Sequence, residues 1–593
     1  MSKKQVRVLS LWSSFLMIFM FCLLSISSIH SNNLLADTST INNSPVIDVN
    51  TGLLLSEGST EIISSSILLA TDIDDTSSEL TYTIISEPDY GRLEFSDNPG
   101  VAITSYTQAD IDTSRLVYVH DGSEPIQIDI SGFSAEFELS SLLAANGGDG
   151  SSGFAINGVK SFNNSGVSVA NAGDVNGDGY DDVLIGSLDT DPFGGEVGET
   201  YLLFGQPQGF SAEFELSSLL EANGGDGTAG FVLHGIDEDD ESGYAVSTAG
   251  DINGDGYDDL LIGARSATPN GFNSGESYLV FGKPIGFPAE FELSSLLVAN
   301  GGDGSAGFVL NGIDAADRSG YSVSSAGDVN GDGYDDLLIG AWGADPNGNF
   351  SGETYVLFGK ATGFSAEFEL SSLLAVNGGD GSDGFVINGI SAFDWSGYSV
   401  SSAGDFNGDG HADIIIGANS ASPNGPQSGE TYVVLGKATG FSAEFELSSL
   451  LAINGGDGSA GFILNGIDEN DGTGNSVSGA GDINGDGYDD LIIGASNASP
   501  NGNNSGKVYV VFGSAVSLPA EFELSSLLSV NGGDGNDGFV INGIAAFDNS
   551  GHFVSDAGDV NGDGYADILI GADGADPNSN NAAGASYIIY GKA

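Results

Sequence analysis

Residues 321–341 read YSVSSAGDVNGDGYDDLLIGA, and closely related stretches occur six times in this chain of 593 residues. The string D-x-N-G-D-G begins, with a constant spacing of 77 residues, at Asp174, Asp251, Asp328, Asp405, Asp482 and Asp559. Units of this length fill residues 132–593 to the last residue. A fixed period indicates a repeat architecture, in which each unit packs against its neighbours.

Each unit contains short apolar runs separated by Gly, Asn and Asp, which is typical of strands rather than helices. In the third unit these runs are FVL (308–310), YSVSS (321–325), LLIGA (337–341) and YVLF (355–358), so we expect four strands per repeat. The LLIGA run lacks alternation, which indicates a strand covered on both faces. Small residues at 324–327 suit a crowded inner strand. The recurring string EFELSSLL predicts a short strand followed by a turn.

Four-stranded units repeated six times around one axis predict an all-β fold, a six-bladed β-propeller. The expected blades correspond to residues 132–208, 209–285, 286–362, 363–439, 440–516 and 517–593. The repeat region opens with an outer strand at 154–156 and ends with a third strand at 587–590. Pairing the first with the last would close the ring and hide the sheet edges. The alternative is an open solenoid or a truncated array.

The loop after the inner strand carries the chemistry. In the first unit Asp174, Asn176 and Asp178 occupy loop positions 1, 3 and 5, and Asp182 occupies position 9. Alternate oxygen ligands followed by a glycine bend suit Ca²⁺, which takes about 6–8 oxygens. The backbone carbonyl of position 7, Tyr180 here, would add a ligand. An EF-hand is rejected because position 12 is Ile185, within an expected strand.

The same reasoning predicts six calcium sites. Their ligands are Asp174, Asn176, Asp178, Tyr180 and Asp182; Asp251, Asn253, Asp255, Tyr257 and Asp259; Asp328, Asn330, Asp332, Tyr334 and Asp336; Asp405, Asn407, Asp409, His411 and Asp413; Asp482, Asn484, Asp486, Tyr488 and Asp490; and Asp559, Asn561, Asp563, Tyr565 and Asp567. Position 8 varies between Asp and Ala, which predicts that it points away from the ion. The competing interpretation is that these strings only form turns.

These units resemble FG-GAP repeats, the blades of the integrin α-chain β-propeller, on the evidence of YSVSSAGDVNGDGYDDLLIGA from Tyr321 and GETYVLFG from Gly352. The resemblance covers residues 132–593 and implies the blade fold and its calcium loops at all six strings. It suggests adhesion. Integrin propellers have seven blades, whereas six units are found in this sequence.

The first 131 residues differ in composition from the repeats. Lys3, Lys4 and Arg7 precede an apolar run at 15–26, an order that predicts a signal peptide over residues 1–31 with cleavage between 27 and 36. A membrane anchor is the alternative, although the run is shorter than the ~20 residues of a spanning helix. Residues 45–125 contain alternating strands, and pieces such as EPDYGRLEF resemble a chondroitin-sulfate-proteoglycan-type repeat, a cadherin-like β-sandwich.

Two features of this N-terminal part bear on ligands and redox chemistry. Asp72, Asp74 and Asp75 form an acidic cluster that we interpret as a solvated loop and leave out of the metal sites. The single cysteine, Cys22, lies inside the predicted signal peptide, so the exported chain would contain no disulfide.

Composition narrows the function. The chain has 83 Asp and Glu against 13 Lys and Arg, for a net charge of -70, which argues against a nucleic-acid partner. The histidines beyond residue 31 occupy different repeat positions, and no nucleophile elbow or H-E-x-x-H string is present, so we predict no enzyme. Trp342 and Trp395 are candidate ligand contacts or blade packing.

We therefore predict a secreted or cell-surface, calcium-binding adhesion module without a membrane span after cleavage. Its partner would be an extracellular protein or glycan. The alternatives are a propeller-based polysaccharide-degrading enzyme and a structural surface spacer.

Overall fold

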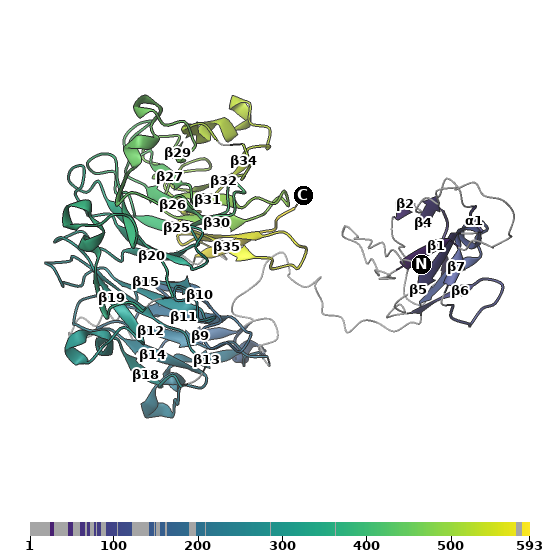
Figure 1. The fold of residues 1–593 in the computed structure, drawn as a ribbon, viewed down its shortest axis with the longest axis horizontal. Coiled ribbons are helices and arrows are strands. Elements are labelled where there is room, and N and C mark those ends of the chain that lie inside the picture. Colours follow the sequence, from purple (N-terminus) through teal and green to yellow (C-terminus); the bar gives the residue numbers. More distant parts are fainter. Residues whose placement is uncertain are drawn as a thin grey trace, which may run out of the picture. The chain divides into compact units, whose positions relative to one another are not determined.

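The computed structural model describes residues 24–28, 46–50, 60–120 and 142–592, with short gaps inside the last two ranges. The chain divides into two compact units, residues 1–136 and 137–593 (Figure 1). The acidic cluster at 72–75 lies outside the described residues.

The first unit is a small β-structure with one short helix. Its elements are β1 (Leu24–Ser28), β2 (Val46–Asn50), β3 (Thr60–Ile62), β4 (Leu68–Thr71), β5 (Leu80–Ile84), β6 (Gly91–Phe95), β7 (Ser105–Thr107), α1 (Gln108–Asp112) and β8 (Leu116–His120). The three-stranded sheets have the orders β1-β5-β7 and β3-β8-β6, and β2 pairs with β4. The β1 strand falls within the predicted signal peptide, where it pairs antiparallel with β5.

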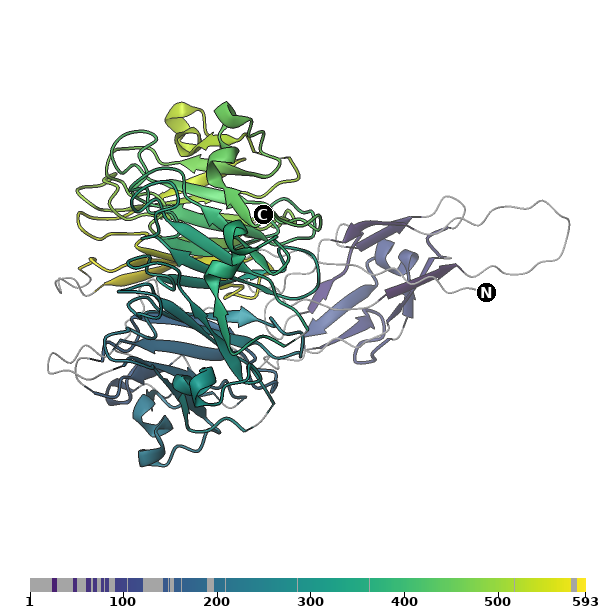
Figure 2. The same cartoon turned by 60° about the vertical axis from the view of Figure 1, so that its left-hand side comes forward.

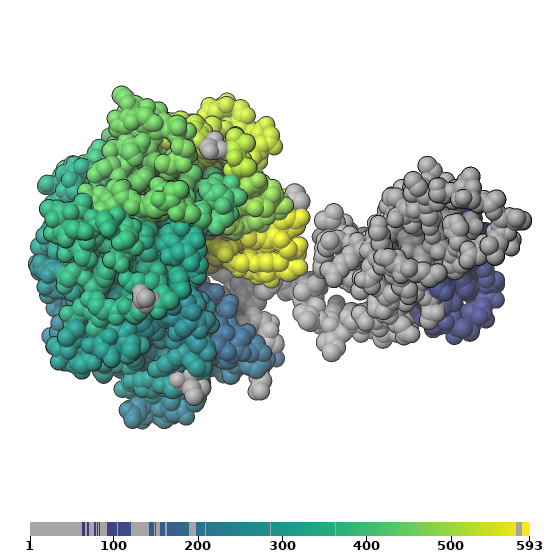
Figure 3. Space-filling view, viewed as in Figure 1, coloured from purple at the N-terminus to yellow at the C-terminus, as the bar shows by residue number. Residues whose placement is uncertain are grey.

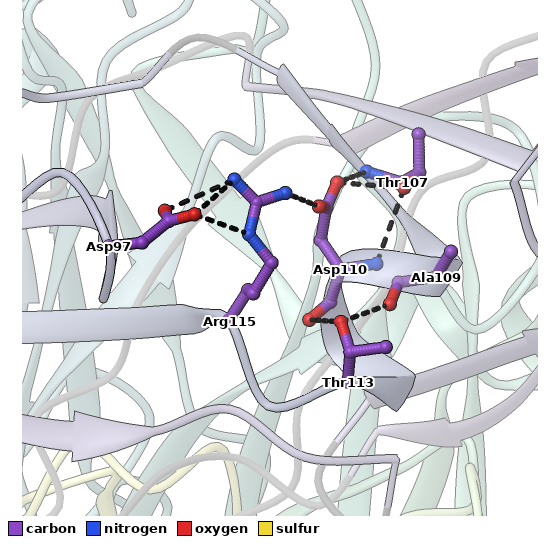
Figure 4. A network of polar contacts seen from close by, with 6 residues as sticks. All are labelled: Asp97, Thr107, Ala109, Asp110, Thr113 and Arg115. Atoms are coloured by element: carbon purple, nitrogen blue, oxygen red, sulfur yellow. Dashed lines mark hydrogen bonds and ion pairs between the residues drawn. The ribbon is translucent and has the colours of Figure 1, made fainter.

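Helix α1 is fixed by a capping box and an arginine. The backbone N–H of Thr107 donates to Asp110 Oδ2 at 2.8 Å, while the Asp110 N–H donates to Thr107 Oγ1 at 3.3 Å (Figure 4). The Arg115 guanidinium then joins Asp110, at 2.6 Å, to Asp97, at 3.1 Å. These bonds anchor a five-residue helix that is too short to be stable alone.

The second unit consists of six blades, which we number 1 to 6 after their innermost strands. The innermost strands are β10 (Ser168–Gly173), β15 (Ala245–Gly250), β20 (Ser322–Gly327), β25 (Ser399–Gly404), β30 (Val477–Gly481) and β35 (Phe553–Gly558). The second strands are β11 (Asp182–Ser187), β16 (Asp259–Ala264), β21 (Asp336–Ala341), β26 (Asp413–Ala418), β31 (Asp490–Ala495) and β36 (Asp567–Ala572). The third strands are β12 (Glu199–Leu203), β17 (Glu276–Val280), β22 (Glu353–Leu357), β27 (Glu430–Val434), β32 (Lys507–Val511) and β37 (Ala585–Ile589).

Outer strands come from later repeats. The fourth strands of blades 1 to 5 are β14 (Gly230–His234), β19 (Gly307–Asn311), β24 (Gly384–Asn388), β29 (Gly461–Asn465) and β34 (Gly538–Asn542). The short fifth strands of blades 1 to 4 are β18 (Glu290–Glu292), β23 (Glu367–Glu369), β28 (Glu444–Glu446) and β33 (Glu521–Glu523). The strands β9 (Ala155–Asn157) and β13 (Glu213–Glu215) form a separate two-stranded sheet. Blade 3 has the order β20-β21-β22-β24-β28, so it draws on three consecutive repeats.

Each described EFELSSLL string forms a short strand and a 3-10 turn, as predicted. These turns are η3 (Leu216–Leu219), η5 (Leu293–Leu296), η7 (Leu370–Leu373), η9 (Leu447–Leu450) and η11 (Leu524–Leu527). Further turns are η2 (Ala144–Asn146), η4 (Glu221–Asn223), η6 (Val298–Asn300), η8 (Ala375–Asn377), η10 (Ala452–Asn454) and η12 (Ser529–Asn531). Buried leucines on the longer turns, such as Leu370 and Leu373, cover the blade core.

The core lies between successive blades. All six residues of β21 are buried, which confirms the prediction from its unbroken apolar run. Side chains of β15, β16 and β17 pack with those of β20, β21 and β22 in one apolar cluster. The succession of blades turns until yellow blade 6 lies beside blue blade 1 (Figures 1 and 2), and the fold is the predicted six-bladed β-propeller.

The predicted strand pairing between the two ends of the ring is wrong. In the described residues β9 pairs with β13 and the sheet of blade 6 ends at β37. Ile156 of β9 instead packs against the cluster around Tyr201 of blade 1, which holds the outer pair on that side. The two ends of the array are blue and yellow in Figure 3, and their innermost strands carry exposed apolar side chains: Val169 of β10 is 63% exposed and Phe553 of β35 is 62% exposed.

Candidate metal-binding loops

Each predicted calcium loop joins the innermost strand of a blade to its second strand. In blade 3 the loop runs from Asp328 to Asp336, and β20 ends in a bulge at Gly327 immediately before it. Gly331 and Gly333 adopt left-handed conformations, with φ of 74° and 90°. Residues with a side chain rarely adopt this backbone conformation, so the two glycines allow the chain to curl around the Asp328 carboxylate.

The carboxylates at positions 1 and 5 face the inside of their own loop. Asp328 Oδ1 accepts hydrogen bonds from Gly331 and Asp332 N–H, at 2.7 and 3.0 Å, and its Oδ2 accepts one from Gly333 at 2.8 Å. Asp332 Oδ1 accepts from the Tyr334 N–H at 3.1 Å. These bonds hold acidic oxygens on the concave side of the loop, where a cation would need them.

Position 9 is a buried carboxylate at the start of the second strand. Asp336 is fully buried, and it accepts hydrogen bonds from Val329 N–H at 3.0 Å and Gly359 N–H at 2.9 Å. Burial raises the pKa of Asp336 to about 8 although both hydrogen bonds lower it, and the charges of Asp332 and Asp328 raise it further. Cation binding would relieve this clustering of negative charge.

Blade 4 tests whether the loop fits a hard cation. Asn407 Oδ1 at position 3 and Asp413 Oδ2 at position 9 are both buried without a hydrogen-bond donor. A buried acceptor with no partner costs about 1–3 kcal/mol. Two such oxygens in one loop match the ligand chemistry of Ca²⁺, which binds carboxylate and amide oxygens.

The side chain at position 8 points away from its own loop and reaches the preceding one. Asp335 Oδ2 accepts a hydrogen bond from the Asp251 N–H at 2.9 Å. Asp258 and Asp489 make the same bond to Asp174 and Asp405. Where position 8 is Ala412, its backbone N–H donates to the carbonyl of Asp328 at 3.0 Å, a bond that is 3.4–3.5 Å long in the loops with Asp258, Asp335 and Asp489.

Position 7 also contributes to the contact between loops. A Cβ added to Gly254 would lie 2.3 Å from the Tyr334 ring of the next blade, so this aromatic side chain packs on the glycine of the preceding loop. His411 takes the same place against Gly331. The side chains at positions 7 and 8 therefore join neighbouring loops, a role that a search for ligands within single loops missed.

All thirty predicted residues lie in these six loops. Within the part of the chain that the structure describes, however, no group of three or more His, Cys, Asp or Glu side chains is already arranged to hold a metal ion. The carboxylates at positions 1, 5 and 9 are instead held by backbone N–H groups. The loops therefore present suitable oxygens, and calcium binding itself stays a prediction.

An aromatic cluster occupies the opposite end of blades 3 and 4. The rings of Trp342 and Trp395 have centroids 5.0 Å apart, and Trp342 meets Tyr321 edge to face. Phe350 and Phe393 extend the cluster, and Phe393 is 56% exposed. Both tryptophans thus pack between blades and border an exposed aromatic surface.

The histidines do not converge on a catalytic arrangement. His234 lies 3.7 Å from carboxylate oxygens of Glu199 and Glu290, whereas His552 of blade 6 lies 3.1 Å from Asp573 of the same blade. His411 belongs to a loop contact, as described above. None of these three shares a site with another.

Comparison with known proteins defines the class of protein. The FG-GAP repeat model matches residues 165–203, 242–280, 319–357, 396–434, 473–511 and 554–589, and a cadherin-like model matches residues 45–134. The chain is thus an FG-GAP repeat propeller protein with an N-terminal cadherin-like domain.

Individual relatives include an integrin chain, an extracellular matrix protein and a phospholipase. Integrin alpha-PS2 of Drosophila melanogaster is 31% identical over 208 residues, 34% of this chain and 13% of that protein. Extracellular matrix protein 3 of Lytechinus variegatus is 36% identical over 81 residues, which are 14% of this chain and 3% of that protein. Phosphatidylinositol-glycan-specific phospholipase D of Bos taurus is 31% identical over 189 residues, which are 32% of this chain and 20% of that protein. The chain spans at most a fifth of the length of each of these relatives.

Proposed function

We propose that this protein is an exported, calcium-stabilised adhesion module whose propeller binds an extracellular protein or glycan. The observation that carries the calcium part is the pair of buried, donor-free oxygens of Asn407 and Asp413 in blade 4. The relatives support the extracellular setting. No helix within the described residues is long and apolar enough to cross a membrane.

Five residues of each loop would hold the ion: the side chains at positions 1, 3, 5 and 9 and the carbonyl at position 7. The ion would neutralise three carboxylates that otherwise repel one another. Because the side chains at positions 7 and 8 contact the preceding loop, ordering one loop also orders the contact to its neighbour. Calcium would in this way stabilise the array of blades as well as single loops.

The aromatic cluster around Trp342 is the proposed ligand surface. Flat indole and phenyl rings offer a large contact area at low entropic cost, and Phe393 is exposed for contact. Asp345 and Asn349 lie on the exposed loop between Trp342 and Phe350, and their polar groups could pair with those of a ligand. The strongly negative chain disfavours polyanionic glycans, so neutral sugars or basic protein surfaces are the expected ligands.

The experiment is a binding screen of the purified protein against glycans and matrix proteins, with calcium and with chelator. We expect a ligand that binds in calcium and is lost on Trp395→Ala, while Phe272→Ala, an exposed aromatic elsewhere, leaves binding intact. Binding that is independent of calcium and of both substitutions would contradict the proposal.

A polysaccharide-degrading enzyme is the second candidate. The similarity to a relative named as a phospholipase D supports an enzyme as an alternative, without pointing to a polysaccharide substrate. Turnover of a polysaccharide panel, lost on a single substitution outside the loops, would favour it. A protein that binds no partner at all would favour a structural spacer.

A further inference from the structure

A second set of acidic clusters lies at the end of the blades opposite to the calcium loops. The third strands of blades 2, 3 and 4 begin with Glu276, Glu353 and Glu430. Glu353 is 9% exposed, and it accepts a hydrogen bond from the Tyr355 hydroxyl at 2.6 Å. The predicted calcium ligands do not include these glutamates, so their burial needs a separate explanation.

Other carboxylates gather around Glu353. Asp317, which is 5% exposed, and Asp314 come from the loop before β20, and the Asp314 N–H donates to Asp317 Oδ2 at 2.9 Å. Burial raises the pKa of Glu353 to about 7, helped by the charges of Asp314, Glu444 and Glu446 and opposed by the Tyr355 hydrogen bond. Burial likewise raises the pKa of Asp317 to about 7, and the charge of Glu353 contributes.

Blade 5 shows what this position accepts. Lys507 stands where blade 3 has Glu353, and its Nζ lies 3.8 Å from both Asp468 Oδ2 and Asp471 Oδ2. Those two residues are the equivalents of Asp314 and Asp317, two repeats further along the chain. A positive charge therefore sits between the two aspartates in blade 5. In blade 3, among the described residues, neither Glu353 nor Asp317 has a cationic partner in an ion pair.

A separate observation points to a ligand in blade 3. Asn388 of β24 is the cross-strand partner of Glu353, and its Nδ2 donates to Glu446 Oε1 at 2.8 Å. Its amide thus lies on the face shared by both glutamates. Asn388 is 6% exposed, and its Oδ1 is buried without any donor. On the face that it shares with Glu353 and Glu446, this amide oxygen therefore lacks a positively charged or donor group.

We propose that blade 3 binds a divalent cation between Asp314, Asp317 and Glu353, with Asn388 Oδ1 as a further ligand. The ion replaces the ammonium that Lys507 supplies in blade 5. Without the ion, the three carboxylates are not arranged as a ligand set. Binding of the ion therefore has to displace the hydrogen bonds from the Tyr355 hydroxyl to Glu353 and from the Asp314 N–H to Asp317. Blade 2 offers the same set in Asp237, Asp240, Glu276 and Asn311, whereas blade 4 has Ser391 in place of one aspartate.

The test counts bound calcium per chain by equilibrium dialysis of the full-length protein. Glu353→Lys copies blade 5, and we expect it to lose one ion and to melt at a higher temperature than the parent in chelator. Lys507→Glu copies blade 3, and we expect it to gain one ion. Asp405→Asn, in a loop of blade 4, serves as the control for the other class of site.

The outcomes separate the two kinds of site. Unchanged ion counts in both Glu353→Lys and Lys507→Glu, with a loss in Asp405→Asn, would overturn this inference and leave the calcium loops standing. If Glu353→Lys stabilises the protein equally with and without calcium and at an unchanged ion count, the cluster is neutralised by protons and the inference is wrong. Loss of a bound ion in Glu353→Lys but not in Asp405→Asn would support the blade 3 site and contradict the loop sites.

Discussion

Asp335 in blade 3 caps the backbone N–H of Asp251 in blade 2, with its Oδ2 2.9 Å from that nitrogen. The bond connects position 8 of one loop with position 1 of the loop before it, and equivalents join other neighbouring loops. The candidate calcium sites are therefore linked in series around the propeller. Their stabilities should depend on one another.

Asp335→Ala tests this link. The substitution leaves the Asp251 N–H without its charged acceptor, so we expect a loss of about 1–2 kcal/mol in the free energy of unfolding. Asp181→Ala is the matched control, because Asp181 occupies position 8 of the first loop and is exposed. Chemical denaturation of both variants gives the comparison. An equal effect in the two would show that the hydrogen bond between loops contributes nothing.

Two glycines separate backbone strain from packing between blades. Gly485 and Gly562 occupy the same loop position with nearly the same φ, 75° and 72°. A Cβ at Gly485 would lie 2.3 Å from the Tyr565 ring, whereas one at Gly562 would meet nothing within 4 Å. We expect Gly485→Ala to destabilise the protein by about 1–3 kcal/mol more than Gly562→Ala.

Thermal melting of both alanine variants measures that difference. Since the backbone strain is common to the two, only the contact with Tyr565 distinguishes them. Equal melting temperatures would mean that the end of the array is packed as tightly as its interior, against the exposure of Phe553 described above.

Acidity should stabilise the calcium-free protein. Burial raises the pKa of Asp259 and Asp336 to about 8, from an ordinary value of 3.8. Between these values the folded state keeps protons that the unfolded chain has released, so the contribution of these aspartates to stability is fully present below about pH 4 and is lost as pH rises to about 8. We expect the melting temperature in chelator to fall from pH 5 to about pH 8.

Calcium should remove most of that fall, because the ion takes the place of the protons at these carboxylates. Melting curves with and without calcium at the same pH values provide the check. A protein in chelator that is more stable at pH 8 than at pH 5 would contradict the raised pKa of these aspartates.

Local pattern was enough to predict much of the fold. The 77-residue period fixed the number of blades, and the unbroken apolar run of β21 revealed a strand buried on both faces. The D-x-N-G-D-G string located the loops because glycine and aspartate act within a few residues of one another. These features depend on neighbours in sequence.

The features that were missed depend on partners in other repeats. The role of Asp335 was hidden because its partner, Asp251, lies 84 residues earlier. The place of β28 in blade 3 could not be read from a three-residue strand that pairs across repeats. The strand β9 pairs with β13, and Ile156 packs against blade 1; strand order alone does not reveal these contacts.

Thermal melting of the protein in calcium and in chelator tests the central claim most directly. Ligand binding at a hundredfold excess over Kd stabilises the folded state by about 2.7 kcal/mol per site. Six linked loops should therefore give a large rise in Tm on adding calcium, reduced in Asp405→Asn. Superimposable melting curves in calcium and in chelator would contradict the account.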